Sequence, residues 1–470
     1  MALPTPEGLQ CEVLALPERG HYVVLGTAGS GKTTMAILRA VYLAKLQGER
    51  VLLVTFNKAL VTYLRSTSRG ELENVDVVNY HRFARGYLNS RGLMGRHDIV
   101  PAYSQNKWTK TELIAKALEK LKSLIPHEEI FHRPLEIFVE EINWIQKMGI
   151  NDLQQYLKAE DIGKGGTKLS LTHRELFFHV FQEYLSIRQN YDYKYDLEDL
   201  AQYVRDELEK DRDQRMYKHI IIDEGQDLSP TMLQSLTKAI PPSGSLTYFG
   251  DVAQQIYGGR ISWRQAGFVS PKIWLFKQNY RNTKEIARLA LAISKSSFFK
   301  ENVDLVEPQF PRASGPLPAI IKFTDTEKEI KSLITQVKHF SQNETVAVLV
   351  RNRETVSSIR QHLRVNNIAS YELKGEMNTW DSSPSIYVGT FHSAKGLEFD
   401  IVFMPFCNDH NLPSSDRIIS LDDVDEAMSE EIKLLYVGVT RAKRGLIITS
   451  TGEVTELLPA NDGLYQEVNK

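Results

Sequence analysis

Cysteine is almost absent from this 470-residue chain, which contains only Cys11 and Cys407. The two residues lie far apart and lack the spacing of metal ligands, so the sequence excludes a disulfide framework and a multi-cysteine cluster. This composition fits a reducing compartment, and we expect a cytoplasmic protein.

Long apolar runs are also lacking. No stretch approaches the roughly 20 residues that a membrane-spanning helix needs. Residues 1–8 lack the basic patch and apolar core of a signal peptide. The sequence therefore predicts no membrane association, and it shows neither an internal short-period repeat nor a low-complexity tract.

The chain has no marked excess of charge, because 57 Lys and Arg residues nearly cancel 59 Asp and Glu residues. Net charge therefore neither requires nor excludes a nucleic-acid partner, and any basic track must be local. What the chain does have is a 42% hydrophobic content, which is enough for a substantial core, and a length that suggests two to four domains.

Short β-branched runs alternate with amphipathic helical stretches, a pattern that predicts an α/β fold with parallel sheets wrapped by helices. The runs in the first half are residues 21–25, 51–55 and 219–223. Those in the second half are residues 319–323, 345–350, 386–390, 400–404 and 445–449. A Pro- and Gly-rich stretch at residues 307–318 predicts a surface loop between the two groups.

Between the predicted strands at residues 51–55 and 219–223 the sequence pattern becomes helical. Long charged amphipathic segments cover residues 109–125, 134–148 and 172–189, with hardly any strand signal. We expect a helical insertion at residues 86–211. The first α/β domain would then comprise residues 1–85 and 212–279, and the second residues 280–470.

A glycine-rich loop follows the first predicted strand and precedes the helical run 34–46. It matches the pattern G-x-x-x-x-G-K-[ST], in which backbone N–H groups converge on phosphate oxygens, the lysine reaches the β- and γ-phosphates and the hydroxyl binds Mg²⁺. The alternative is a chance glycine turn, but the strand and helix on either side argue for the phosphate site. The predicted ATP-binding residues are Gly26, Thr27, Ala28, Gly29, Ser30, Gly31, Lys32, Thr33 and Thr34.

A carboxylate pair, Asp223 and Glu224, ends the apolar strand at residues 219–223. An ATPase with a phosphate loop needs such an acid for its metal, so Asp223 would hold Mg²⁺ beside Thr33, and Glu224 would polarise the attacking water. Strand ends also carry acids for solubility alone. The presence of the glycine-rich loop favours the catalytic interpretation.

Residues 222–230, Ile-Asp-Glu-Gly-Gln-Asp-Leu-Ser-Pro, resemble motif II of the UvrD/Rep/PcrA helicases of superfamily one, with Gly225 where the family usually has Ala. Other stretches resemble further motifs of the family in the same order: residues 55–58, 79–83, 195–200, 248–257, 275–283, 388–400 and 435–444. The resemblance spans Gln10 to Arg444. It implies two RecA-like P-loop domains and an ATP- and Mg²⁺-dependent 3′ to 5′ DNA helicase or translocase.

The resemblance also implies roles around the nucleotide. Gln254 would sense the γ-phosphate, and Arg281 and Arg441 would contact it from the second domain, where planar guanidinium groups suit phosphate oxygens. Cleft closure would then depend on ATP.

Three further side chains are implied for the nucleoside. Gln10 resembles the glutamine that reads adenine, Tyr280 would stack on the base, and Glu398 would lie near the sugar. An aromatic face is well suited to a purine.

The strand-facing motifs provide aromatic and polar side chains of the kind that bind single-stranded nucleic acid. These predicted contacts are Phe56, Asn57, His81, Tyr257, Trp263, Arg264 and His392. Residues 258–262 lengthen the segment between the motif at residues 248–257 and Trp263, so this tryptophan either stacks on a base or belongs to the core.

Larger relatives carry a helical domain between motifs IV and V, and residues 281–390 are too few to hold one. No acid and lysine cluster indicates a nuclease, so any cleavage would need a partner protein. The first alternative to a helicase is thus a translocase that does not unwind DNA, or the motor subunit of a repair or defence nuclease. A second is an ATP-gated protein-interaction switch. RNA as the track stays open.

Overall fold

In the computed structural model the residues described are 5–27, 29–47, 49–55, 74–101, 107–159, 171–251, 263–299, 313–373, 384–414, 418 and 424–470. Five residues of the predicted site lie outside this part of the chain: Ala28, Phe56, Asn57, Gln254 and Tyr257.

The first sheet has six parallel strands in the order β3-β2-β4-β5-β1-β6. Its inner strands are mostly apolar and buried on both faces, as expected for a parallel sheet covered by helices. The strand bounds are β1 (Gly20–Gly26), β2 (Val51–Thr55), β3 (Val75–Asn79), β4 (His219–Ile222), β5 (Ser245–Gly250) and β6 (Lys272–Phe276).

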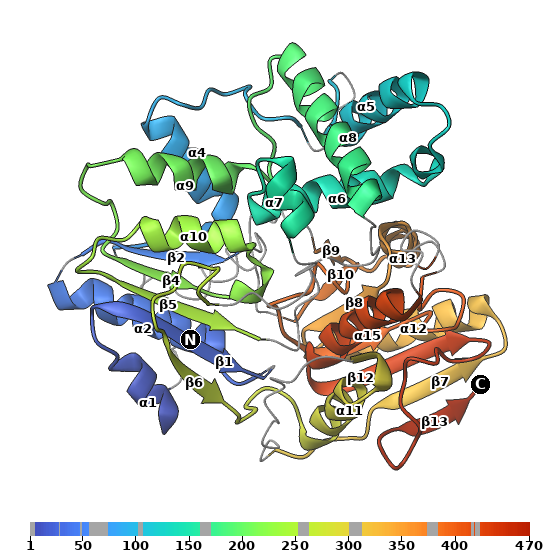
Figure 1. Ribbon diagram of the computed structural model, residues 1–470. Coiled ribbons are helices and arrows are strands. Elements are labelled where there is room, and N and C mark those ends of the chain that lie inside the picture. Colours follow the sequence, from blue (N-terminus) through green and yellow to red (C-terminus); the bar gives the residue numbers. More distant parts are fainter. Residues whose placement is uncertain are drawn as a thin grey trace.

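Helices cover both faces of this sheet (Figure 1). Because successive strand residues point to opposite faces, Val24 joins one core with α1 (Leu9–Leu14) and α2 (Lys32–Gln47), whereas Val23 joins another. The second core includes residues of three helices: α4 (Tyr80–Ser90), α9 (Leu200–Lys210) and α10 (Pro230–Lys238). A short 3₁₀ turn, η2 (Gly225–Asp227), links β4 to α10.

The described residues between β3 and β4 contain helices and no strand, and the bounds of the helical insertion, residues 86–211, stay a prediction. Its helices share a hydrophobic core of their own, and α5 begins with a capping box formed by Thr109 and Glu112. The elements of this insertion are α5 (Lys110–Leu124), η1 (Glu129–His132), α6 (Leu135–Met148), α7 (Leu153–Lys158) and α8 (Leu171–Asn190).

The second sheet has seven parallel strands in the order β13-β7-β12-β11-β8-β10-β9. The strands are β7 (Ala319–Phe323), β8 (Val346–Val350), β9 (Tyr371–Glu372), β10 (Ile386–Thr390), β11 (Phe399–Met404), β12 (Ala442–Thr451) and β13 (Gln466–Asn469).

Two pairs of helices sandwich the second sheet and build separate cores on its faces. One face packs against α11 (Lys284–Ser294) and α15 (Val424–Thr440), next to the turn η4 (Ser297–Phe299). The other packs against α12 (Thr326–Phe340) and α13 (Arg353–Val365). The two parallel sheets confirm the predicted α/β class. Among the described helices, none is long and apolar enough to cross a membrane.

We call the six-stranded sheet with its helices the first domain, and the seven-stranded sheet with α11, α12, α13 and α15 the second domain. In parallel sheets the carboxyl ends of the strands meet at one edge, where ligands commonly bind. The glycine-rich loop follows β1 and the acid pair follows β4, so this edge of the first domain carries both predicted phosphate elements.

Candidate functional site

The glycine-rich loop is held in a shape that only glycine adopts readily at two positions. Gly29 and Gly31 have φ angles of +77° and +82°, in the left-handed region. A Cβ atom on Gly29 would lie 2.3 Å from Asn279 Oδ1. The carbonyl of Gly29 accepts a 2.8 Å hydrogen bond from the Tyr280 N–H. The loop is thus in close contact with the segment that leads to the second domain.

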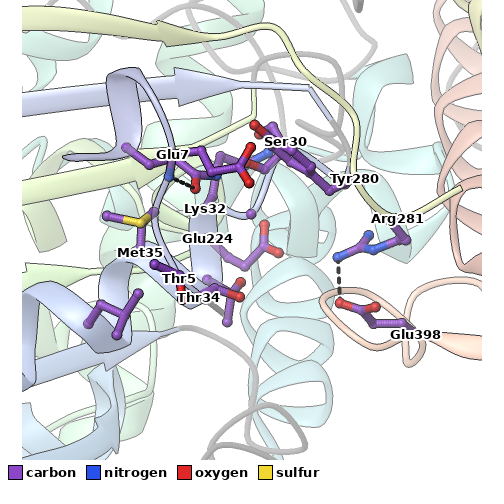
Figure 2. Close-up of a pocket in the computed structure, with 15 residues that line it drawn as sticks. Thr5, Glu7, Ser30, Lys32, Thr34, Met35, Glu224, Tyr280, Arg281 and Glu398 are labelled. Atoms are coloured by element: carbon purple, nitrogen blue, oxygen red, sulfur yellow. Dashed lines mark hydrogen bonds and ion pairs between the residues drawn. The ribbon is translucent and has the colours of Figure 1, made fainter. Parts of the chain in front are cut away.

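A cavity of about 350 Å³ opens beside this loop (Figure 2), within the range of roughly 300–1,000 Å³ typical of small-molecule sites. It is lined from the first domain by the loop and the start of α2, and from the other side by residues that precede α11 and β11. The lining residues are Thr5, Glu7, Gln10, Gly29, Ser30, Gly31, Lys32, Thr33, Thr34, Met35, Leu38, Glu224, Tyr280, Arg281 and Glu398.

Lys32 is a buried residue of the cavity lining. Its ammonium donates hydrogen bonds to the carbonyls of Gly26 (2.8 Å) and Thr27 (2.7 Å) and lies 3.4 Å from a carboxylate oxygen of Asp251. These contacts fix the charge next to the loop amides. The geometry suits a polyanion such as a triphosphate.

Asp223 is 1% exposed, and within the described part of the chain neither of its carboxylate oxygens has a hydrogen-bond partner. Burial, together with the adjacent Glu224 charge, raises the pKa of Asp223, and the nearby Thr33 and Lys32 partly oppose this. A buried carboxylate without partners is costly unless a cation joins it. The donor set of Asp223 and the Thr33 hydroxyl therefore fits Mg²⁺, which prefers oxygen ligands.

Glu224 has φ 51° and ψ 41°, a left-handed conformation that is unusual for a residue with a side chain. Its carboxylate accepts a hydrogen bond from the side-chain amide nitrogen of Gln226. The side-chain oxygen of Gln226, Oε1, in turn accepts a hydrogen bond from the Asp251 N–H. Burial acts to raise the pKa of Glu224, but the charges of Lys32, Lys395 and Arg441 hold it below its ordinary value. The residue is thus kept as a carboxylate facing the cavity.

Arg281 and Glu398 point toward one another at one side of the cavity (Figure 2). Arg281 Nη2 donates a 3.1 Å hydrogen bond to Glu398 Oε1. Burial would raise the pKa of Glu398, but the charges of Arg281, Lys443 and Arg441 lower it. Tyr280 lies next to them with its side chain 54% exposed, open to a flat ligand.

Arg441 lies deeper and does not line the cavity. Its fully buried guanidinium donates to the carbonyls of Val437 and Leu397 and to the Thr440 hydroxyl. Its positive charge adds to those of Lys32 and Lys395 in lowering the pKa of Glu224, and to those of Arg281 and Lys443 in lowering the pKa of Glu398.

Two asparagines without a predicted role fix the segment around Arg281. Asn279 Oδ1 accepts hydrogen bonds from the N–H groups of Arg281 (2.9 Å) and Asn282 (3.2 Å). Asn282 Nδ2 donates to the carbonyl of Ala442 at 2.6 Å. Both asparagines are buried, so they join the Arg281 backbone to the second sheet.

The cavity therefore brings together most of the predicted ATP-site residues that the structure describes. Gly26, Thr27 and Asp223 do not line it, although the first two accept hydrogen bonds from Lys32 and the third precedes Glu224; Arg441 does not line it either. The prediction missed four lining residues: Thr5, Glu7, Met35 and Leu38. Thr5 and Glu7 precede α1 without any motif, and the two apolar residues of α2 resemble ordinary core positions.

The predicted contacts to single-stranded DNA that the structure describes lie just after β-strands or just before β6. His81 is in the first turn of α4, and His392 follows β10. Arg264 is exposed, whereas Trp263 is half-buried and packs edge to face with Tyr248 and Phe268 at centroid distances of 5.0 and 5.3 Å. Trp263 thus contributes to the core of the first domain, and a base could reach only its exposed part.

Two family models match the chain. Residues 9–271 match the UvrD/REP helicase N-terminal domain, and residues 274–378 and 370–453 match the UvrD-like helicase C-terminal domain. These matches cover the first domain, the helical insertion, the second domain except β13, and every described residue of the cavity except Thr5 and Glu7.

Individual proteins are similar to different extents. A "Probable DNA helicase" of Mycoplasma pneumoniae is 23% identical over 459 residues, which is 92% of this chain and 81% of that protein. A "DNA helicase II" of Rickettsia typhi is 40% identical over 82 residues, but these cover only 17% of this chain and 12% of that protein. A solved C-terminal domain of a possible DNA helicase from Lactobacillus plantarum is 21% identical, covers 40% of this chain and 98% of that chain, and has a TM-score of 0.30.

Proposed function

Because the chain belongs to the UvrD-like helicase family, we propose that it is an ATP-dependent motor that moves along single-stranded DNA in the 3′ to 5′ direction. In this proposal residues 1–85 and 212–279 form one half of the motor, residues 280–470 form the other, and residues 86–211 are inserted in the first half.

The observation that carries this proposal is the two-sided lining of the cavity. The glycine-rich loop and Lys32 lie on the first domain, and Arg281 and Glu398 lie on the side of the second. A nucleotide that occupies the cavity touches both halves at once. Binding would therefore draw the domains together, and loss of the γ-phosphate would release them.

Each side chain has a proposed task in hydrolysis. Lys32 holds the β- and γ-phosphates, and Glu224 accepts a hydrogen bond from the attacking water and orients it. Thr33 and Asp223 would hold Mg²⁺, which when bound neutralises charge on the phosphates. Arg281 stabilises the charge that develops on the γ-phosphate, and Arg441 adds positive potential from its buried position.

The remaining proposed ATP contacts give specificity. Gln10 reads the adenine edge and Tyr280 stacks on the base, while Glu398 contacts the sugar. Gln254, from the sequence outside the described residues, would report the γ-phosphate to the strand.

For the DNA track we propose His81, Arg264 and His392, with the exposed part of Trp263 and with Phe56, Asn57 and Tyr257. Stacking on aromatic faces and phosphate contacts from cations do not require a particular base. Movement would thus be independent of sequence.

A second candidate is a translocase that does not separate strands by itself, or a motor subunit that works with a nuclease. The connection between β9 and β10 favours it. These strands end and begin at residues 372 and 386, so no helical domain of the kind found in larger relatives fits there. Unwinding would then need a partner protein.

The deciding experiment measures ATP hydrolysis without nucleic acid, with a poly-deoxynucleotide and with a poly-ribonucleotide, and duplex unwinding alongside. The motor proposal expects strong stimulation by the deoxynucleotide. Stimulation without unwinding would support the second candidate, and stimulation by the ribonucleotide alone would mean that the motor moves on RNA rather than DNA. Hydrolysis indifferent to both polymers would refute the motor and support an ATP-gated interaction switch.

A further inference from the structure

A buried ion pair crosses from the first domain to the second. Asp227 is the last residue of η2, and Lys395 lies in the turn between β10 and β11. The Lys395 ammonium donates a hydrogen bond to Asp227 Oδ1, and the two side chains are only 6% and 3% exposed. Neither residue lines the cavity, and neither had a predicted role.

Such a pair is a poor source of bulk stability, because the attraction between buried charges is largely offset by the loss of their hydration. Removing one partner is different, since it leaves an uncompensated charge in a dry interface. Consistent with this, burial raises the pKa of Asp227 to about 6, and the Lys395 charge opposes that rise. The pair thus favours one particular relative position of the two domains.

On the first domain the pair connects directly to the hydrolytic acid. The Asp227 N–H donates a 3.1 Å hydrogen bond to the Glu224 carbonyl, which closes the η2 turn. Within that turn Gln226 contacts the Glu224 carboxylate and the Asp251 N–H, and Asp251 pairs with Lys32. A shift of Asp227 would therefore move the groups around the phosphate.

On the second domain the pair connects to the turn that carries His392, a proposed contact to single-stranded DNA. The Lys395 N–H donates a 3.2 Å hydrogen bond to the carbonyl of His392. Two residues after Lys395, the Leu397 carbonyl accepts from Arg441, and Glu398 pairs with Arg281. One short turn thus carries His392, the ion-pairing lysine and the acceptors of both arginines.

We propose that Lys395 and Asp227 are positioning residues that couple the nucleotide site to the strand-contacting turn of the second domain. This inference rests on the proposed function. It assigns no chemistry to either side chain, since both act by fixing the η2 turn and residues 391–398 against each other.

The test compares Lys395→Met, Lys395→Arg, Asp227→Asn and the double variant Asp227→Asn with Lys395→Met. For each, the ATPase kcat and the KM for ATP are measured without DNA and with saturating poly-deoxythymidine, together with the thermal unfolding midpoint. Lys110→Met is the matched control, because Lys110 forms a partly buried ion pair with Glu198 (2.9 Å) that stays within the first domain and its insertion.

Lys395→Met and Asp227→Asn are each expected to lower the DNA-stimulated kcat about tenfold, the scale of a typical coupling between sites. The KM for ATP should change little. Lys395→Arg should restore most of the rate, and the double variant should be no worse than either single one, since both remove the same interaction. Lys110→Met should retain the stimulation.

Wild-type stimulation in Lys395→Met, or equal losses with and without DNA, would overturn the inference, as would losses that multiply in the double variant. If Lys395→Met does not fold, Asp227→Asn, which keeps the side-chain volume, decides by the same criteria. An absence of stimulation in the wild type would instead overturn the proposed function, so the two failures are distinguishable.

Discussion

Replacing Arg281 by Ala is the most informative change at the cavity. The side chain is 13% exposed, donates to Glu398 at 3.1 Å, and has an Nε–H that lacks a hydrogen-bond partner among the described residues. The segment that carries it is fixed by Asn279 and Asn282. The guanidinium is therefore positioned before any ligand arrives, and part of its donor capacity is available to phosphate.

The size of the expected loss follows from the number of arginines near the site. A single arginine that stabilises phosphoryl transfer accounts for about 10³ to 10⁵ in rate. Because the Arg441 charge persists in the variant, we expect the lower end, about 10³-fold in kcat. At about 1.36 kcal/mol per tenfold, this corresponds to about 4 kcal/mol of transition-state stabilisation. The variant also removes the hydrogen bond from Arg281 to Glu398, and this should have a smaller effect that appears in nucleotide binding.

The assay is steady-state ATP hydrolysis with saturating single-stranded DNA, combined with calorimetric binding of a non-hydrolysable ATP analogue. Arg281→Ala should bind the analogue within about threefold of the wild type, because interactions made only in the transition state affect kcat. Arg281→Lys should fall between the two, since it keeps the charge but loses the planar fork. A kcat close to that of the wild type in Arg281→Ala would refute the assignment, and so would a loss confined to binding.

Other substitutions test the remaining parts of the cavity. Lys32→Ala should reduce phosphate release to background, because no other lysine among the described residues lines the cavity; hydrolysis near the wild-type rate would exclude the loop as the phosphate site. Asp223→Asn should raise the Mg²⁺ concentration needed for half-maximal hydrolysis by about tenfold or more, and an unchanged Mg²⁺ titration would place the metal elsewhere. Gln10→Ala should narrow the preference for ATP over GTP, measured as the ratio of kcat/KM values, and an unchanged ratio would remove Gln10 from base recognition. Gly29→Ala should weaken analogue binding and lower the thermal midpoint, because its Cβ would lie 2.3 Å from Asn279 Oδ1; wild-type binding would show that the loop tolerates the side chain.

The sequence predicts most of the inner strands but misses β5, in which Ser245 and Thr247 interrupt the apolar residues, and it predicts none of the edge strands. Residues 51–55, 319–323 and 386–390 form strands with the predicted bounds. In contrast, the edge strands β6 and β13 carry mostly exposed side chains, and β13 also lacks an apolar run. Edge strands gain their pairing from the sheet, so their own residues signal little.

The candidate site shows a similar division. Side chains that follow a parallel strand gather at one edge by topology, which is why Lys32 and Glu224 meet in the cavity as the motifs predict. Pairs between residues far apart in the sequence leave no local signal, since Arg281 and Glu398 are 117 positions apart and Asp227 and Lys395 are 168 apart. Only the tertiary arrangement shows such contacts.

Directed movement on DNA is the central claim, and displacement of streptavidin from biotinylated single strands tests it most directly. With ATP, the protein should accelerate release from the 5′ end of an oligodeoxynucleotide and have little effect at the 3′ end, and Lys32→Ala should be inactive at both. ATP hydrolysis at a normal rate without accelerated release from either end would contradict the account.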